Sequence, residues 1–146
     1  PELLTTEMLV LRNANIPVVS FDKYINIEIS HSILPDYSTI SPKGTGAALV
    51  LERIDLTGLQ EIIFSPPATS DIKDLEKWNI EVRIDDIHGE LIGSANEVLT
   101  KDGKVGLRAE LIKKENYHDL YFVFVNKNAD MEDVGRFKIW RVKFVQ

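Results

Sequence analysis

The longest unbroken run of apolar residues in the chain spans residues 120–125, inside the stretch 118–126. In an extended strand successive side chains point to opposite faces. On that periodicity both faces are apolar, with Leu120, Phe122 and Phe124 on one and Tyr121, Val123 and Val125 on the other. A strand without a polar face is typical of the centre of a sheet. The pattern therefore predicts a central strand that is covered on both sides.

Strict alternation of apolar and polar residues marks two further strands. In residues 78–84 the apolar positions begin with Trp78 and recur at every second residue, which predicts a strand with one face on the core. Residues 25–29 alternate in the same way, and we expect Asn26 and Glu28 to face solvent. Propensity and turn signals predict the remaining strands at 7–12, 18–21, 47–56, 60–64, 90–95, 105–112 and 136–144. Because Pro17 has no N–H to donate, it predicts a sheet edge or a bend.

The last of these strands, 136–144, has no clean apolar face under strict alternation. A β-bulge near Ile139 and Trp140 would bring four apolar residues to one side, namely Phe137, Ile139, Val142 and Phe144. We therefore expect a bulge at this position.

The connecting segments are rich in glycine, proline and short polar residues. Residues 30–46 predict a long loop with one short strand at 37–40, and residues 70–77 predict a loop because eight residues are marginal for a helix. Turns are expected at 85–89 and 101–103, and a surface loop at 128–135. About nine strands and no convincing helix predict an all-β fold, a two-sheet antiparallel β-sandwich.

Composition narrows the class of protein. The 146 residues are 44% hydrophobic and 27% charged, ordinary values for one globular domain, and we expect a single domain over 1–146. The net charge of −6 argues against nucleic acid as a partner, and Lys138, Arg141 and Lys143 are interpreted as a solvated strand face. No apolar run approaches the roughly 18 residues of a membrane span. Without cysteine, disulfides and thiolate zinc sites are excluded. Because Pro1 is not a native start, we expect a fragment of a larger protein.

No arrangement of residues predicts catalysis or a metal site. His31, His88 and His118 are isolated in the sequence, without the spacing of metal ligands. Asp85 and Asp86 belong to a predicted hairpin turn, where aspartates are common. The acidic stretch 128–133 offers oxygen ligands for calcium but lacks the spacing of a known calcium loop. We predict no enzyme, no cofactor and no metal, with structural calcium unsupported.

Aromatic side chains are the remaining candidates for binding, because the apolar faces of sugars stack on exposed rings. Trp78 heads an alternating strand and is assigned to the core. Tyr37 and Tyr117 lie in predicted loop or turn sequence, where a ring is freer to meet a ligand.

Three stretches together resemble the family 6 carbohydrate-binding modules, a galactose-binding-like family appended to bacterial multidomain exported proteins. They are residues 47–58, 78–93 and 117–144, which follow one another in the family's order, and the last, with the central strand, is the most specific. The resemblance implies a jelly-roll sandwich and a non-catalytic role in holding an enzyme near glycan.

The resemblance also implies where sugar would bind, and the chain departs from the family at these places. Ala48 stands near one expected aromatic, the loop 96–106 has no ring, and Trp140 stands where an asparagine would fall. The family's calcium would need acidic residues in the first and last strands, where Glu7 is the only one. A ligand-binding cleft would then be rebuilt from Tyr37, Asn96, Tyr117, Asn126 and Trp140, or a second site would lie on a sheet face.

Two functions follow from this reading. The first is glycan binding, with a polysaccharide or oligosaccharide and the neighbouring domains of the same polypeptide as partners, and without nucleic acid or membrane. The second is a structural spacer or interaction domain of the same fold, whose sugar cleft has lapsed. The resemblance implies a secreted, periplasmic or cell-surface location in either case. Exposed rings beside polar side chains would favour the first function.

Overall fold

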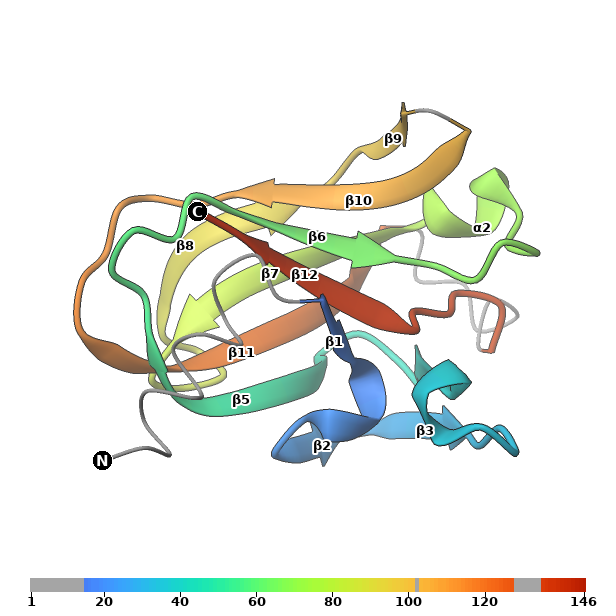
Figure 1. The fold of residues 1–146 in the computed structure, drawn as a ribbon, viewed down its shortest axis with the longest axis horizontal. Helices are drawn as coiled ribbons and strands as arrows, with labels where there is room; N and C mark the ends of the chain where they lie inside the picture. The colour runs from blue at the N-terminus through green and yellow to red at the C-terminus, as the bar shows by residue number, and fades with distance from the viewer. Residues whose placement is uncertain (1–14, 102, 128–134) are drawn as a thin grey trace.

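The computed structural model describes residues 15–101, 103–127 and 135–146. These residues form mostly β-strands, joined by turns and a few short helical segments (Figure 1). The elements in chain order are β1 (Asn15–Pro17), the 3-10 helix η1 (Val18–Ser20), β2 (Lys23–Ile25), β3 (Ile27–Ser30), the 3-10 helix η2 (Pro35–Tyr37), β4 (Thr39–Pro42), β5 (Ala47–Asp55), β6 (Glu61–Ser65), α2 (Ile72–Leu75), β7 (Trp78–Ile84), β8 (Glu90–Ala95), β9 (Val98–Lys101), β10 (Lys104–Glu110), β11 (Tyr117–Asn126) and β12 (Arg141–Val145). Over the described part of the chain, no helix has the length and hydrophobicity to cross a membrane.

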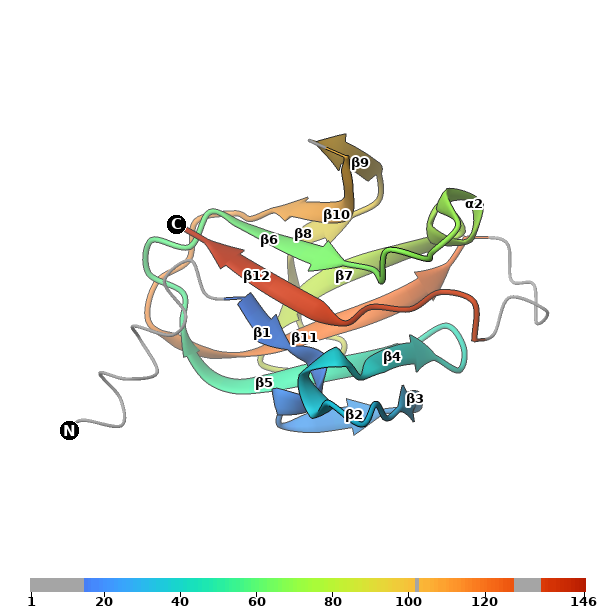
Figure 2. The same ribbon diagram turned by 45° about the vertical axis from the view of Figure 1, so that its right-hand side comes forward.

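The strands form two five-stranded sheets and a two-stranded ribbon. The first sheet has the order β1-β12-β6-β10-β9, the second has the order β2-β5-β11-β7-β8, and β3 pairs with β4. Figures 1 and 2 show the two large sheets as stacked layers, with the ribbon of β3 and β4 beside the start of β12. The predicted two-sheet antiparallel sandwich is confirmed. The described residues contain twelve strands rather than about nine. The predicted strand 25–29 is divided between β2 and β3, and the short strands β1 and β9 were not predicted.

The core lies between the sheets and is built around β11, which is the central strand of its sheet, as predicted. Leu120, Phe122 and Phe124 are completely buried. The Phe122 ring meets Phe64 of β6 edge-on, with ring centroids 5.1 Å apart, and so joins the two layers. Burial of a side chain of this size contributes about 1.5–3 kcal/mol. On the opposite face of β11 Val123 is buried, whereas Tyr121 and Val125 are only half-buried.

Trp78 belongs to the core, as its place in an alternating strand predicts. Its ring is buried and packs against Phe137 at a centroid distance of 5.8 Å. Strand β7 alternates buried and half-buried residues along its whole length.

The burial pattern expected from a bulge in the last strand is present, although the regular part of the predicted strand 136–144 begins only at Arg141, with β12. Ile139 pairs with Ile40 across an isolated bridge, whereas Arg141 begins the regular pairing of β12 with Ser65 of β6. The four residues that the bulge was expected to bring to one side, Phe137, Ile139, Val142 and Phe144, are all fully buried. Trp140 and Arg141, between them, are both half-buried. The bulge therefore leaves two consecutive side chains on the outer surface.

The prediction of a strand at 18–21 is wrong, because Val18–Ser20 is a 3-10 helix. A 3-10 helix has three residues per turn, so side chains three apart share a face. Val18 and Phe21 both enter the core in this way. Pro17, as predicted, lies on an edge, since it ends β1 at the margin of the first sheet.

The predicted strand at 25–29 is broken at Asn26, whose φ of 53° is left-handed. Ile25 and Ile27 therefore fall in different sheets, and Ile25 is 38% exposed rather than buried. Asn26 and Glu28 are exposed, as predicted. The predicted strand at 37–40 starts later, with β4.

Two further elements differ from the prediction. Ile72–Leu75 forms one helical turn instead of loop, because Asp71 Oδ1 accepts the Lys73 N–H and Leu75 is fully buried, which compensates for the short length. β9, which was not predicted, pairs with β10 across the expected turn, where Gly103 has a φ of 75°. The predicted strand 7–12 and the loop 128–133 with its calcium ligands lie outside the described residues.

Candidate functional site

Tyr37 and Trp140 form a pair of stacked rings at the surface, which we call the aromatic platform. Their ring centroids are 5.5 Å apart and the ring planes differ by 10°. Tyr37 is 58% exposed, and Trp140 is half-buried beneath it. The platform lies where η2 approaches the start of β12. Figures 1 and 2 both show the connection between β3 and β4, which contains η2, beside the start of β12.

Local structure explains why these two rings meet. Pro35 starts η2, and its carbonyl accepts the Ser38 N–H, so the chain turns at Tyr37. The mutual backbone bonds of Ile40 and Ile139, at 2.9 and 3.0 Å, then tie this segment antiparallel to the last strand. In that direction the residues before Ile40 run alongside those after Ile139. The bulge turns Trp140 outward, where it receives the Tyr37 ring.

Arg141 adds a positive charge to the aromatic platform. Its guanidinium carbon lies 4.8 Å from the centroid of the Trp140 ring, within cation–π range. One guanidinium nitrogen, Nη1, donates to the Asn15 carbonyl at 3.1 Å and fixes the side chain. The sequence indicated Arg141 only as part of a solvated strand face. The signal that could have identified it is the predicted bulge, which places residues 140 and 141 on the same side.

The other residues of the expected cleft lie elsewhere. Lys127, which directly follows Asn126 at the end of β11, donates from Nζ to the Asn96 carbonyl at 3.1 Å. The backbone N–H of Asn126 donates to Thr45 Oγ1.

Tyr117 begins β11 and Asn126 ends it, so at about 3.3 Å per residue they are separated by about 30 Å. Of the predicted cleft residues the structure thus brings together Tyr37 and Trp140, while Tyr117 lies at the far end of β11.

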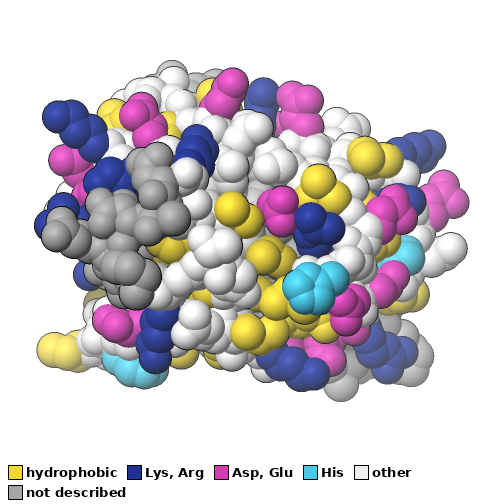
Figure 3. Space-filling model, turned by 180° about the vertical axis from the view of Figure 1, so that it is seen from behind, with side chains coloured by type: hydrophobic (Ala, Val, Ile, Leu, Met, Phe, Trp, Pro, Cys, Tyr) yellow, Lys and Arg dark blue, Asp and Glu magenta, His cyan; other side chains and the backbone are white. Residues whose placement is uncertain are grey.

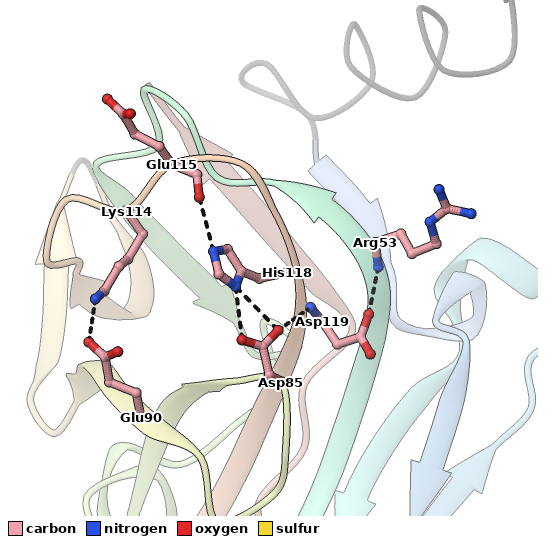
Figure 4. Close-up of polar contacts among 7 residues, drawn as sticks. All are labelled: Arg53, Asp85, Glu90, Lys114, Glu115, His118 and Asp119. Atoms are coloured by element: carbon pink, nitrogen blue, oxygen red, sulfur yellow. Dashed lines mark hydrogen bonds and ion pairs between the residues drawn. The ribbon is translucent and has the colours of Figure 1, made fainter.

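A polar network surrounds His118 at that far end (Figure 4). Nδ1 of the ring faces both carboxylate oxygens of Asp85, at 2.9 and 3.2 Å, and Nε2 faces the Glu115 carbonyl at 2.9 Å. The Asp85 N–H donates to the Asp119 carbonyl at 2.9 Å, and the Asp119 N–H donates to Asp85 Oδ1 at 3.3 Å. The Asp119 carboxylate in turn accepts the Arg53 N–H at 2.9 Å. Lys114 and Glu90 form an ion pair alongside. We call this set of contacts the His118 network.

The geometry of His118 suits a structural role and not proton transfer. A neutral imidazole has one donor and one acceptor nitrogen, whereas here both nitrogens face acceptors. The imidazolium form satisfies both contacts. The hydrogen bond to Asp85 raises the pKa of His118 above its usual 6.5, and the Glu115 carbonyl acts in the same direction. Because both nitrogens are already occupied within the protein, neither is free to act on a substrate.

The described residues contain no group of three or more histidine, cysteine or acidic side chains that could hold a metal ion. His31 and His88 are exposed and separate. The Tyr24 hydroxyl donates to the Val18 carbonyl at 2.7 Å. Burial raises the pKa of that hydroxyl.

The outward face of the second sheet is the other surface that the sequence suggested. The register places Tyr121 beside Arg83 and Val123 beside Glu81. Arg83 is already held by the Glu81 carboxylate at 3.2 Å and the Gly89 carbonyl at 2.8 Å, and the Tyr121 ring is half-buried. Figure 3, seen from behind, shows hydrophobic side chains scattered among acidic and basic ones on this side. The face offers less free aromatic surface than the platform does.

A shallow hollow lies at the end of the first sheet remote from the platform. It is lined by Gly58, Leu59, Gln60, Glu61, Glu110, Leu111 and Lys113 and contains no aromatic ring. Nothing in its lining resembles a sugar-stacking surface.

No family model matches the chain. No curated protein sequence matches it either. Solved structures, however, share its fold over most of its length. A family 6 carbohydrate-binding module from Clostridium cellulolyticum, solved in complex with xylose, has a TM-score of 0.67 at 21% identity, covering 91% of this chain and 97% of that chain.

Two more structures extend this likeness. A β-1,3-glucan binding module of family 6 from Bacillus halodurans has a TM-score of 0.67 at 16% identity, covering 93% of this chain and 99% of that chain. A family 43 arabinoxylan arabinofuranohydrolase from Bacillus subtilis, in complex with cellotetraose, has a TM-score of 0.67 at 18% identity, covering 93% of this chain but 27% of that chain. The sandwich described above is therefore the fold of the family 6 carbohydrate-binding modules.

Proposed function

We propose that this chain is a non-catalytic carbohydrate-binding module that holds a larger exported protein against a polysaccharide or oligosaccharide. The observation that carries the proposal is the aromatic platform, a 58% exposed tyrosine stacked on a tryptophan. The apolar C–H face of a sugar packs on such a ring, and the exposed ring face loses water when it does so.

The spacing of the rings defines how a sugar would bind. A sugar inserted between two rings needs about 7–8 Å, twice an ordinary carbon contact distance. The rings of Tyr37 and Trp140 are closer, at 5.5 Å. The sugar therefore packs on the outer face of the stacked pair. Arg141, fixed beside Trp140, supplies hydrogen-bond donors to the hydroxyl groups.

The surrounding protein and its location are part of this proposal. A region of the same fold makes up 27% of the family 43 hydrolase chain, which supports a role as one module among several. We infer that the neighbouring domains of the same polypeptide are partners and that the whole is secreted, periplasmic or on the cell surface of a bacterium. The proposal involves no nucleic acid, membrane or cofactor.

The alternative function, a structural spacer without ligand, receives less support. That function would fit a surface whose rings are all buried. Here Tyr37 is exposed, and Trp140 beneath it remains partly accessible.

Binding is tested with the polysaccharides that its structural neighbours suggest: xylan, cellulose and β-1,3-glucan, together with their soluble oligosaccharides. The readout is tryptophan fluorescence, backed by calorimetry. Trp78 is buried and Trp140 partly exposed, so only Trp140 should respond. We expect Tyr37→Ala and Trp140→Ala to weaken binding at least about tenfold, the cost of truncating an anchoring aromatic residue.

Tyr117→Ala is the matched control, because Tyr117 is also an exposed tyrosine but lies at the opposite end of β11. We expect it to bind like the unmodified protein. Equal losses in Tyr37→Ala and Tyr117→Ala would contradict the assignment of the site. Absence of binding to every glycan in a folded sample would overturn the proposed function.

A further inference from the structure

The charge around Arg141 differs from that of the rest of the first sheet. Arg141 pairs with Pro17 of β1 and with Ser65 of β6, and the next outward residue of β12, Lys143, pairs with Asn15 and Ile63. None of these neighbours is acidic. Two cations therefore lie side by side on an uncharged background, in a chain whose net charge is −6.

The acidic residues of this sheet face contact another arginine and not Arg141. Glu61 pairs with Val145 at the far end of β12, and Glu110 pairs with Glu61. Arg108 forms ion pairs with both carboxylates, at 3.6 and 3.1 Å. Within the described part of the chain, Arg141 has no carboxylate partner. Its positive charge is therefore available at the edge of the aromatic platform.

The orientation of Arg141 suits a bound anion. Nη1 donates one hydrogen bond to the Asn15 carbonyl, and the guanidinium carbon lies 4.8 Å from the centroid of the Trp140 ring, so the planar guanidinium fork is held at two points. Such a fork binds a carboxylate through two parallel hydrogen bonds. Asp36, next to Tyr37 in η2, is exposed.

We propose that the aromatic platform binds a glycan that carries uronic acid residues, with Arg141 as the residue that recognises the carboxylate. The inference rests on the proposed function, because it names the class of glycan for the same site. The sugar ring packs on Tyr37 and Trp140 while its carboxylate, or that of a branch, meets the guanidinium. Lys143 strengthens the local positive potential without contacting the ring pair.

The test compares xylotetraose with the same oligosaccharide carrying one glucuronic acid branch, by calorimetry. We expect the acidic oligosaccharide to bind about threefold to tenfold more tightly, in the range of a single partly exposed ion pair. Raising the salt from about 0.05 M to about 0.5 M should remove most of this preference, because exposed charges are screened.

Arg141→Gln should abolish the preference for the acidic oligosaccharide, so that this variant binds both oligosaccharides with the same affinity. Arg141→Lys keeps the charge but loses the fork, so a partial preference should remain. Arg53→Gln is the matched control: it removes the same charge from an exposed side chain at the opposite end of the molecule, and the preference should persist. Thermal unfolding checks that each variant is folded.

The outcomes separate the two proposals. If xylotetraose and its acidic counterpart bind equally, or if Arg141→Gln keeps the preference, the acidic-glycan inference is wrong while the proposed function stands. If neither oligosaccharide binds, both are wrong. A preference lost equally in Arg141→Gln and Arg53→Gln would show attraction by overall charge, which also overturns the inference.

Discussion

The two ends of the sandwich differ in how completely their polar groups are satisfied. At the His118 network both ring nitrogens of His118 have partners, and Asp85 and Asp119 hold one another through backbone and side-chain contacts. At the aromatic platform Tyr37 is 58% exposed. Arg141 has a cation–π contact and one backbone partner there, but no carboxylate partner in the described residues.

This difference indicates that the His118 network is structural and that the aromatic platform is available for binding. Charged groups that are fully paired inside the protein have little left to offer a ligand, and their pairing mainly fixes backbone geometry. Three residues near the His118 network, Arg53, Asp85 and Asn116, have left-handed φ values of 56°, 70° and 70°. The network holds these unfavourable conformations, whereas the platform needs no such support.

The largest effect is expected from Gly89→Ala, which would disturb the turn between β7 and β8. A Cβ at this position would lie 2.0 Å from the Ile84 carbonyl oxygen and 3.0 Å from that of Asp86, both backbone atoms. The turn must therefore rearrange, and we expect the free energy of unfolding to fall by about 2 kcal/mol or more. Urea unfolding measures this. The control is Lys104→Ala, at an exposed position, which should leave the free energy of unfolding nearly unchanged. Gly103→Ala is not used as a control, because Gly103 has a φ of 75° that alanine adopts only with strain.

If Gly89→Ala left stability unchanged, the tight turn would not be what positions Asp85. Glycan binding by the folded fraction should persist in this variant, because the platform lies at the other end of the molecule.

A smaller effect is expected from Asp85→Asn. Asparagine tolerates the left-handed φ of 70° at this position, so the change removes the charge while leaving the backbone in place. The loss of the ion pair with His118 should cost up to about 1 kcal/mol of unfolding free energy. It should also lower the pKa of His118, since the hydrogen bond to Asp85 is the main cause of its elevation. Proton NMR titration of the imidazole measures the pKa, and an unchanged value would contradict the network.

The smallest effect concerns pH. The folded-state pKa of His118 lies above its usual 6.5, so its stabilising contribution is fully present below that value and is lost as pH rises through the folded pKa. The stability difference between the unmodified protein and His118→Gln should therefore be larger at about pH 5.5 than at about pH 9. A difference that grew with pH would reverse the assigned sign.

Much of the fold could be predicted because burial leaves a periodic trace in the sequence. The alternation in 78–84 gave the bounds and the inward face of β7, and the two apolar faces of 118–126 identified the central strand. The imperfect alternation in 136–144 predicted a bulge, since no straight strand could bury Phe137 and Phe144 together. At Val18 no such trace existed, because a 3-10 helix formed there. At Asn26 the alternation was present, but the left-handed backbone breaks the strand.

The candidate site was less predictable. Aromatic type alone favoured Tyr37, Trp140 and Tyr117 alike, and only the pairing of Ile40 with Ile139 brings Tyr37 to Trp140. Tyr117 and Asn126 belong to the same strand, but they are its two ends and therefore cannot line one cleft. Arg141 was noticed for its charge and not for its position beside a ring.

By itself, the sequence determined an all-β sandwich built around one central strand, because the hydrophobic effect requires each strand to show its buried face as a pattern of side chains. Tertiary structure alone decided which exposed residues meet. Contacts such as Tyr37 on Trp140, or His118 on Asp85, join residues far apart in the chain. They depend on strand register and on the geometry of bulges and turns, which side-chain periodicity does not record.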